Sequence, residues 1–240
     1  MHPPARQPIA RSPWWKALTG EVRLPPFGLV LATGVVAFGG LALAARAMPY
    51  FAFDPPVSRA VQSVQAPWLD RLAAAVSWIG YPPQVDVLVA GLALGLWLLG
   101  RRWQAAAVAV AGAGAGGLYL LTQQLVDRPR PSPDLVRVAV QLPNSAFPSG
   151  HEATLTAVLG FLAFWCYTSC PTLAGRWLSV LAVGLGLLVL ALARVYEGEH
   201  WASDVLGGFC LGCVWLAVTI HLYRWARQRS SRTRRGRPQA

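Results

Sequence analysis

Charged side chains are scarce in this sequence of 240 residues. Only 13% of the residues are charged and ten are acidic, whereas about 25% are charged in a typical soluble domain. Lysine is almost absent, since Lys16 is the only one, and the four cysteines do not form two Cys-x-x-Cys motifs. These shortages exclude an ordinary soluble enzyme, a disordered chain and a disulfide scaffold, and we interpret the cysteines as small apolar side chains.

The sequence is instead rich in long apolar runs. Hydrophobic residues make up 55% of the chain, mean hydropathy is +0.42, and several uncharged runs exceed the roughly 18 residues typical of a membrane span. The expected spans are residues 25–45, 81–100, 103–126, 153–175, 177–193 and 205–223. We therefore predict an all-α polytopic membrane protein in which six transmembrane helices form one domain, residues 25–224, between tails at 1–24 and 225–240.

Residues 57–79 break this pattern because charged side chains are interleaved with apolar ones. Arg59, Asp70 and Arg71 alternate there with valine, leucine and tryptophan. The spacing favours an amphipathic helix that lies in the membrane interface, and a buried hairpin is the alternative.

The basic residues predict how the spans are oriented. With both termini in the cytoplasm, 14 lysines and arginines lie on the cytoplasmic side and seven on the outer side, and Glu21 is the only acidic residue inside. Cytoplasmic loops carry such an excess, so we expect a multi-pass protein of the cell (inner) membrane with both ends inside. Much of the net charge of +11 lies in seven arginines after residue 223, which favours contact with anionic membrane lipids over nucleic-acid binding.

Three polar stretches meet at the outer helix ends under this topology, namely residues 123–133, 144–152 and 194–204. Ionisable groups at that depth are costly unless they are paired or used, so these stretches are candidates for a functional site. In the last one, His200 and Asp204 are four residues apart and share a helix face. The carboxylate can fix the imidazole tautomer and leave the other nitrogen as a nucleophile or base, or the pair can simply cap a helix.

The other two stretches supply groups that bind anions. Pro148-Ser149-Gly150-His151 precedes an apolar run, so its amides stand at a helix N-terminus, where the helix dipole favours an anion. Arg128 and Arg130, separated by proline, form a stiff cationic turn whose guanidinium groups match phosphate oxygens. A plain helix cap and an incidentally basic loop are the alternatives, but together the three stretches favour phosphoryl transfer.

In these residues the chain resembles the type-2 phosphatidic acid phosphatase superfamily, in its membrane-embedded branch. The family has three motifs: Lys, six residues and Arg-Pro; Pro-Ser-Gly-His; and Ser-Arg, five residues, His, three residues, Asp. The second is complete at residues 148–151, the first ends in Arg130-Pro131, and the third is present as Arg194, His200 and Asp204. The order and the spacing agree, and the motifs cover residues 123–204.

The resemblance implies a role for each motif residue. His200 would be the nucleophile that forms a phosphohistidine, Asp204 would orient it, and His151 would protonate the leaving group. Gln123, Arg130, Ser149, Gly150 and Arg194 would bind the phosphoryl oxygens. The resemblance implies neither a metal nor another cofactor, and no carboxylate cluster in the sequence is typical of a Mg²⁺ site.

The sequence departs from the family pattern at two motif positions. Gln123 replaces the lysine, and Ala193 replaces the serine. Gln123 removes one positive charge from the phosphate site, and Arg128 is the candidate to replace it. Glu197 and Glu199 flank the nucleophile, and we expect them to pair with Arg128, Arg130 or Arg137.

These features lead to a function and an alternative. We expect an integral membrane phosphatase whose substrate is a lipid phosphate or diphosphate, such as phosphatidic acid, phosphatidylglycerol phosphate or polyprenyl diphosphate. The alternative, motivated by Gln123 and Ala193, is a weak or inactive protein of the same fold that binds or transports lipid phosphates. Vanadate-dependent haloperoxidases have a similar site, but they are soluble. The oligomeric state is not readable from the sequence.

Overall fold

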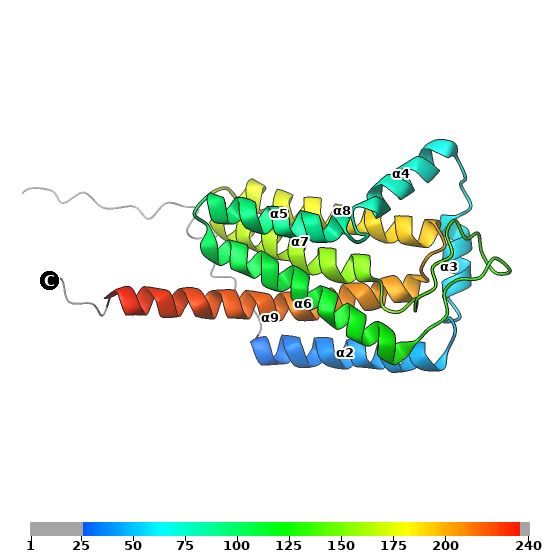
Figure 1. Cartoon of the computed structure of the whole chain (residues 1–240), viewed down its shortest axis with the longest axis horizontal. Helices are drawn as coiled ribbons and strands as arrows, with labels where there is room; N and C mark the ends of the chain where they lie inside the picture. Colours follow the sequence, from blue (N-terminus) through cyan, green and yellow to red (C-terminus); the bar gives the residue numbers. More distant parts are fainter. Residues whose placement is uncertain (1–25, 236–240) are drawn as a thin grey trace, which may run out of the picture.

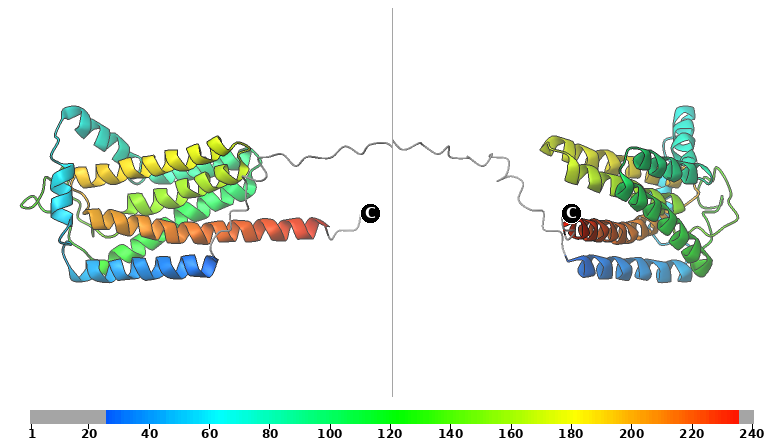
Figure 2. Two further views of the ribbon diagram at one scale, coloured as in Figure 1. Left: turned by 180° about the vertical axis from the view of Figure 1, so that it is seen from behind. Right: turned by 60° about the vertical axis from the view of Figure 1, so that its left-hand side comes forward.

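The computed structural model describes residues 26–235, and over that range the chain is a bundle of helices without a strand. The predicted tail at 1–24 lies outside the described residues. The helices are α2 (Phe27–Ala47), α3 (Asp54–Val61), α4 (Pro67–Trp78), α5 (Gln84–Leu98), α6 (Arg102–Val126), α7 (Gly150–Ser169), α8 (Leu173–Tyr196) and α9 (Ala202–Arg235). The long helices run side by side, while α3 and α4 lie across one end of the bundle (Figures 1 and 2).

Four of these helices are long and apolar enough to cross a membrane, namely α2, α6, α8 and α9. The shorter apolar helix α5 has 15 residues, about 22 Å at 1.5 Å per residue, so its length is less than the ~30 Å thickness of the hydrocarbon layer. Helix α7 has 20 residues, but its first turn contains His151 and Glu152. The all-α membrane architecture is confirmed for the described residues.

Helix α7 is the central element of the bundle and packs against α6, α8 and α9. Its first eight residues after Gly150 are all buried, which explains why this helix need not be as apolar as one that faces lipid. Glycines allow α9 to approach it closely: a Cβ on Gly208 would stand 2.4 Å from the carbonyl oxygen of Ser149, and one on Gly212 2.6 Å from Cβ of Thr156. By contrast, large apolar side chains such as Val36, Leu43 and Leu98 are exposed on the periphery.

Two boundaries differ from the sequence-based expectation for local reasons. The fourth span was expected to reach residue 175, but α7 ends at Ser169 and α8 begins at Leu173. Pro171 has no amide hydrogen to continue a helix, and the hydroxyl of Thr172 caps α8 by accepting from the amide of Gly175. The stretch 57–79 forms two helices rather than one, because residues 62–66 leave the helix and Pro67 starts a new one.

The direction of the helices brings all three polar stretches to one end. Helices α2, α6 and α8 finish at the end where α5, α7 and α9 begin, and the C-terminal part of α9 lies at the opposite end (Figure 1). The predicted tail 225–240 in fact continues α9 as a helix up to Arg235.

Candidate active site

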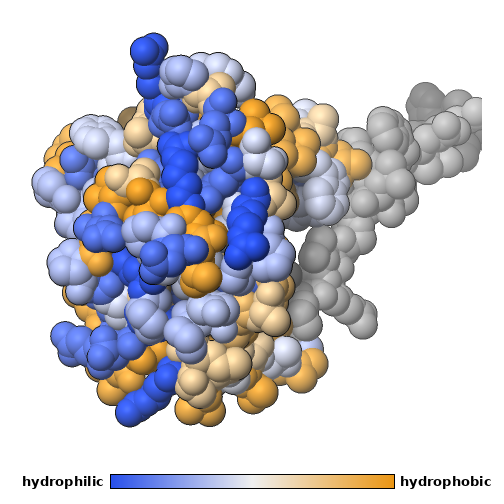
Figure 3. Space-filling model, turned by 90° about the vertical axis from the view of Figure 1, so that its right-hand side faces the viewer, coloured by the Kyte–Doolittle hydropathy of each residue, from blue (hydrophilic) through white to orange (hydrophobic). Residues whose placement is uncertain are grey.

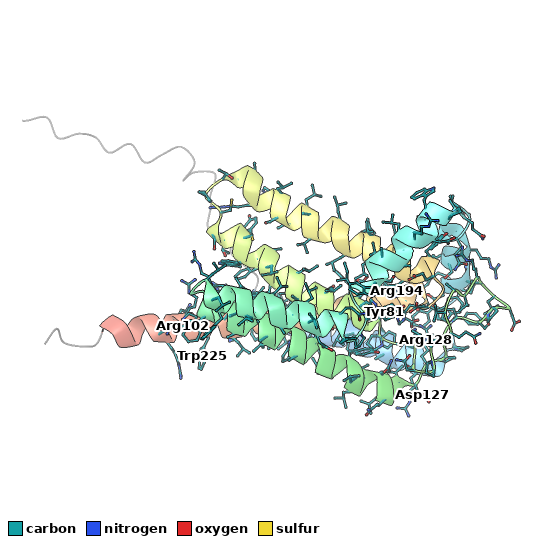
Figure 4. The ribbon with its side chains drawn as sticks, turned by 45° about the horizontal axis from the view of Figure 1, so that its top comes forward. Tyr81, Arg102, Asp127, Arg128, Arg194 and Trp225 are labelled. Atoms are coloured by element: carbon teal, nitrogen blue, oxygen red, sulfur yellow. The ribbon has the colours of Figure 1, made fainter. Side chains whose placement is uncertain are left out.

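The end of the bundle where α7 and α9 begin carries the polar stretches. Hydrophilic side chains predominate on this end, interrupted by hydrophobic patches (Figure 3). Tyr81, Arg128 and Arg194 lie there, whereas Arg102 and Trp225 lie at the other end (Figure 4). Loops and helix termini, rather than one helix, therefore build the site.

His200 lies just before α9, and its side chain is buried. Its Nδ1 is 2.8 Å from the carbonyl oxygen of Ala146, and its Nε2 is 3.5 Å from Nη1 of Arg130. A carbonyl oxygen only accepts hydrogen bonds, so the contact places the imidazole proton on Nδ1 and leaves the lone pair on Nε2. Burial, and then the positive charge of Arg130, hold the pKa of His200 well below its ordinary value, which keeps the imidazole neutral.

Asp204 occupies the first turn of α9, four residues after His200. Its Oδ2 accepts from the amide of Trp201 at 2.8 Å but is 4.0 Å from Nδ1 of His200. The sequence suggested that Asp204 orients the imidazole directly, whereas here Ala146 is the nearer acceptor. Asp204 instead caps α9 and pairs with Arg128.

The N-terminus of α7 forms one side of the site. The amide of Ser149 donates to the carbonyl of Asp204 at 3.0 Å, which ties the second motif to the third. Gly150 permits close packing, because a Cβ there would stand 2.9 Å from the ring of Tyr119. Among the described residues the buried hydroxyl of Ser149 has no partner, so it is available to a ligand at this helix N-terminus.

His151 and Arg194 form the other side of the site. Nε2 of His151 lies 3.0 Å from Nη1 of Arg194 and 3.0 Å from the carbonyl oxygen of Ser77. The Arg194 side chain is fully buried, and its Nε has no partner among the described residues. An unpaired buried guanidinium nitrogen is costly, and together with the free hydroxyl of Ser149 it suits an anionic ligand.

Arg130 approaches His200 from the loop after α6. Its guanidinium donates to the carbonyl and side-chain oxygens of Asn144, at 2.9 and 2.8 Å, and to the carbonyl of Glu199 at 2.7 Å. These contacts join the first motif to the loops before α7 and α9. Burial lowers the pKa of Arg130, and the charge of Glu199 partly opposes this effect.

The comparison with known families agrees with this geometry. The model of the PAP2 superfamily matches residues 102–228, which include the whole of α6 and all three motifs. The chain belongs to the PAP2 superfamily. The resemblance seen in the motifs is thereby confirmed, and with it the classification of the chain as a phosphoric ester hydrolase.

Relatives in the PAP2 superfamily include two bacterial enzymes. The chain is 24% identical over 160 residues to phosphatidylglycerophosphatase B of Bacillus subtilis (strain 168), covering 66% of this chain and 77% of that protein. It is 31% identical over 173 residues to the putative undecaprenyl-diphosphatase YbjG of Escherichia coli (strain K12), covering 66% and 80%.

Two crystal structures share the fold. The transmembrane PAP2-type phosphatidylglycerolphosphate phosphatase of Bacillus subtilis superimposes with a TM-score of 0.69 at 21% identity, over 80% of this chain and 94% of that one. LpxE of Aquifex aeolicus superimposes with a TM-score of 0.58 at 21% identity, over 72% and 98%. At this identity the likeness concerns the fold alone.

Gln123, at the lysine position of the first PAP2 motif, is held by neutral partners. Its amide nitrogen donates to the hydroxyl of Tyr119 and to the carbonyl of Ser145, both at 2.9 Å. Arg130 contacts the same Ser145 carbonyl at 3.3 Å, so Gln123 lies beside the arginine of its own motif. The position is occupied by a hydrogen-bond donor that lacks the positive charge.

Arg128 does not replace this missing charge. Its guanidinium is fully buried and binds Asp54 at 3.1 Å, Asp204 and the hydroxyl of Ser203. Both carboxylates are themselves fully buried. Arg128 therefore neutralises acidic side chains and links α3 to the start of α9.

The two glutamates near His200 pair with Arg194, not with the arginines expected from the sequence. Nη2 of Arg194 is 2.7 Å from Oε2 of Glu197 and 2.9 Å from Oε1 of Glu199. The side chain of Arg137 instead binds Asp70 at 2.6 Å. Only the main-chain carbonyl of Glu199 contacts Arg130.

All eight predicted site residues of the PAP2 motifs lie at this end of the bundle, and the contacts above connect them in one network. In the part of the chain that the structure describes, no three histidine, cysteine or acidic side chains are grouped to hold a metal ion. Sequence reasoning missed Ser77 and Tyr81, and it assigned no role to Asn144 and Ala146, which lie in the polar stretch 144–152. Ser77, Tyr81 and Ala146 contact the motif residues through main-chain or hydroxyl oxygens, which the spacing of residues in a sequence does not reveal. Ser77 and Tyr81 also lie outside the range matched by the family model.

Proposed function

We propose that the protein is an integral membrane phosphatase that hydrolyses a lipid phosphate or diphosphate through a phosphohistidine on His200. The observation that carries this proposal is the convergence of two buried histidines and two arginines at the N-terminus of α7. Nε2 of His200 lies 3.5 Å from Arg130, and Nε2 of His151 lies 3.0 Å from Arg194. Such an arrangement provides a nucleophile, an acid and donors for phosphoryl oxygens.

The reaction proceeds in two balanced steps. Nε2 of His200 forms a bond to phosphorus while the bond from phosphorus to the leaving oxygen breaks, and His151 gives that oxygen a proton. Water then attacks the phosphohistidine, His151 takes up the proton of the water, and inorganic phosphate and neutral His200 are released. Arg130, Arg194, Gln123, Ser149 and the amide of Gly150 bind the phosphoryl oxygens, and Asp204 holds the start of α9.

The position of the site in the bundle favours a lipid substrate. The phosphate-binding groups lie at the ends of helices that are apolar enough to span a membrane, at the depth where lipid headgroups lie. Phosphatidic acid, phosphatidylglycerol phosphate and polyprenyl diphosphate all place a phosphoryl group at that depth. The names of the relatives support the second and third of these.

The proposed topology has six spans, with α5 and α7 added to the four long apolar helices. Both termini are cytoplasmic, and the site faces the outer side of the cell (inner) membrane. The support is the distribution of basic residues, since Arg101, Arg102 and Arg176 lie at the end opposite the site and cytoplasmic loops are rich in such residues.

A panel of substrates tests the proposal. The purified protein in detergent is incubated with phosphatidic acid, phosphatidylglycerol phosphate or polyprenyl diphosphate, and released phosphate is measured. We expect hydrolysis of at least one, and a loss of more than about a thousandfold in His200→Ala. His221→Ala is the matched control, because His221 lies in α9 far from the site and stacks on Phe27.

Failure of the parent protein on all three lipids would contradict the phosphatase proposal. Lipid-phosphate binding that persists in His200→Ala, without hydrolysis by the parent, would favour the binding protein suggested by Gln123. Equal activity of parent and His200→Ala would exclude the phosphohistidine.

A further inference from the structure

The turn between α4 and α5 contacts two motif residues although it precedes the range matched by the family model. Gly80 packs against His151 so closely that a Cβ on it would stand 2.1 Å from Cδ2 and 2.9 Å from Nε2 of the imidazole. The carbonyl of Ser77 lies 3.0 Å from the same Nε2. The turn therefore covers the Cδ2–Nε2 edge of the ring and leaves the edge that carries Nδ1 facing away from it.

Tyr81 links this turn to Arg194. Its hydroxyl accepts from Nη2 of Arg194 at 3.2 Å and donates to Oε1 of Glu199. The Arg194 guanidinium lies 5.2 Å from the centre of the tyrosine ring, and the ring meets His151 edge-on at 4.7 Å between centroids. One side chain thus contacts an arginine and a histidine from two different motifs.

Two carboxylates contact the same Arg194 nitrogen, Nη2, that the Tyr81 hydroxyl contacts. Nη2 of Arg194 also contacts Glu197 and Glu199, and Oε2 of Glu197 accepts from the hydroxyl of Ser77 at 2.5 Å. All recorded partners of Arg194 other than His151 are therefore on Nη2, while its buried Nε stays unpaired. The negative charges of Glu197 and Glu199 oppose anion binding at Arg194. Their contacts with Nη2 can instead hold the guanidinium in a fixed orientation.

We propose that Tyr81 is a positioning residue of the active site, and that it fixes Arg194 and Glu199 so that Nε of Arg194 stays free for a phosphoryl oxygen. The proposal rests on the phosphatase function above. The fixed guanidinium needs no reorganisation as charge develops in the transition state. Burial raises the pKa of the Tyr81 phenol, so it remains a hydrogen-bond donor to Glu199 throughout the range of activity.

Tyr81→Phe tests this role because it removes only the hydroxyl. We expect kcat to fall about tenfold, since hydrogen bonds to two charged partners are lost, while KM changes little. Inhibition by orthovanadate, used as a probe of phosphoryl binding, should weaken by a similar factor. Tyr167→Phe is the matched control, because Tyr167 lies near the other end of α7 and packs on Trp177.

A double-mutant cycle decides whether Tyr81 acts through Arg194. If it does, Tyr81→Phe has little further effect on vanadate inhibition or kcat in an Arg194→Lys background. Additive losses, or an unchanged kcat in Tyr81→Phe with a normal melting temperature, would overturn the proposal while the phosphatase function stands. Glu199→Gln is the second variant: it keeps an acceptor for the phenol, and we expect a smaller loss than for Tyr81→Phe.

The two proposals fail in different ways. If the parent protein is active and Tyr81→Phe has the same kcat, only the positioning role of Tyr81 is contradicted. A parent that hydrolyses none of the three lipids contradicts the phosphatase function itself.

Discussion

At the scale of single residues, the surroundings of His200 decide its chemistry. The carbonyl of Ala146 fixes its proton on Nδ1, and burial together with the charge of Arg130 disfavours a second proton. The neutral imidazole is the nucleophilic form. The unperturbed histidine pKa is about 6.5, so an exposed histidine would be partly protonated near neutral pH, whereas His200 stays neutral.

The neutral state of His200 predicts how activity depends on pH. Because the pKa of His200 is lowered, we expect it to take up a proton only well below pH ~6.5, and activity to be lost on that acid side. Histidine NMR signals followed against pH, with His200→Asn to assign them, measure this without substrate. A His200 signal that titrates at pH 7 or above would contradict the prediction.

Gln123 predicts a gain of activity by substitution. Its amide nitrogen donates to Tyr119 and Ser145, and a lysine ammonium there would add a positive charge beside Arg130. We expect Gln123→Lys to raise kcat/KM for phosphatidic acid about tenfold, as for one charge-assisted hydrogen bond. Gln124→Lys, which places the same charge on an exposed neighbour, is the control, and an equal effect of both variants would refute a local cause.

At the scale of elements, the approach of α9 to α7 holds the second and third motifs together. The amide of Ser149 donates to the carbonyl of Asp204, and Gly208 lies against Ser149 one turn further along α9. The glycine is required for this distance, because any Cβ would meet main-chain atoms that cannot rotate away.

Gly208→Ala should therefore destabilise the protein and reduce its activity. Its Cβ would stand 2.4 Å from the Ser149 carbonyl, and overpacking of this kind costs about 1–3 kcal/mol. We expect a lower melting temperature and a loss of phosphate release. Gly184→Ala is the matched control, since a Cβ there meets nothing within 4 Å and alanine favours a helix; equal behaviour of the two variants would be evidence against the packing argument.

The sequence predicted the motifs and most helices because each leaves a local signal. Apolar runs predicted the long helices, and α7 begins at Gly150, three residues before the expected start of its span at residue 153. The partners of the charged residues left no such signal. Glu197 and Glu199 lie nearer in sequence to Arg194 than to the arginines first considered, but which cation they meet depends on how α4, α5 and α8 pack.

The partners of Arg128 could not be predicted from the sequence either, because they lie much further away along the chain. Its ion pair with Asp54 spans 74 residues and its contact with Asp204 spans 76. A basic turn beside a motif arginine suggested phosphate binding, whereas burial between two carboxylates gives it a structural role. Only the fold brings these three side chains together.

At the scale of the whole molecule, the opposite ends of the bundle should face different compartments. In an otherwise cysteine-free protein, we expect Asp134→Cys, in the exposed loop on the site's end, to react with an impermeant maleimide added outside spheroplasts. In a second protein that retains Cys170, between α7 and α8, as its single cysteine, we expect reaction only after the spheroplasts are opened. The reverse pattern would contradict the proposed orientation.

Helix α9 also decides whether the groups of the site can assemble. This last helix packs against α2, α6 and α7 and follows directly on His200. Without α9, Arg128 would lack its partner Asp204, and α7 would lack the neighbour against which Ser149 is held. A variant that lacks α9 would therefore keep Arg128, Arg130 and Arg194 but lose the packing that holds the second motif against the third, and we expect it to have no phosphatase activity.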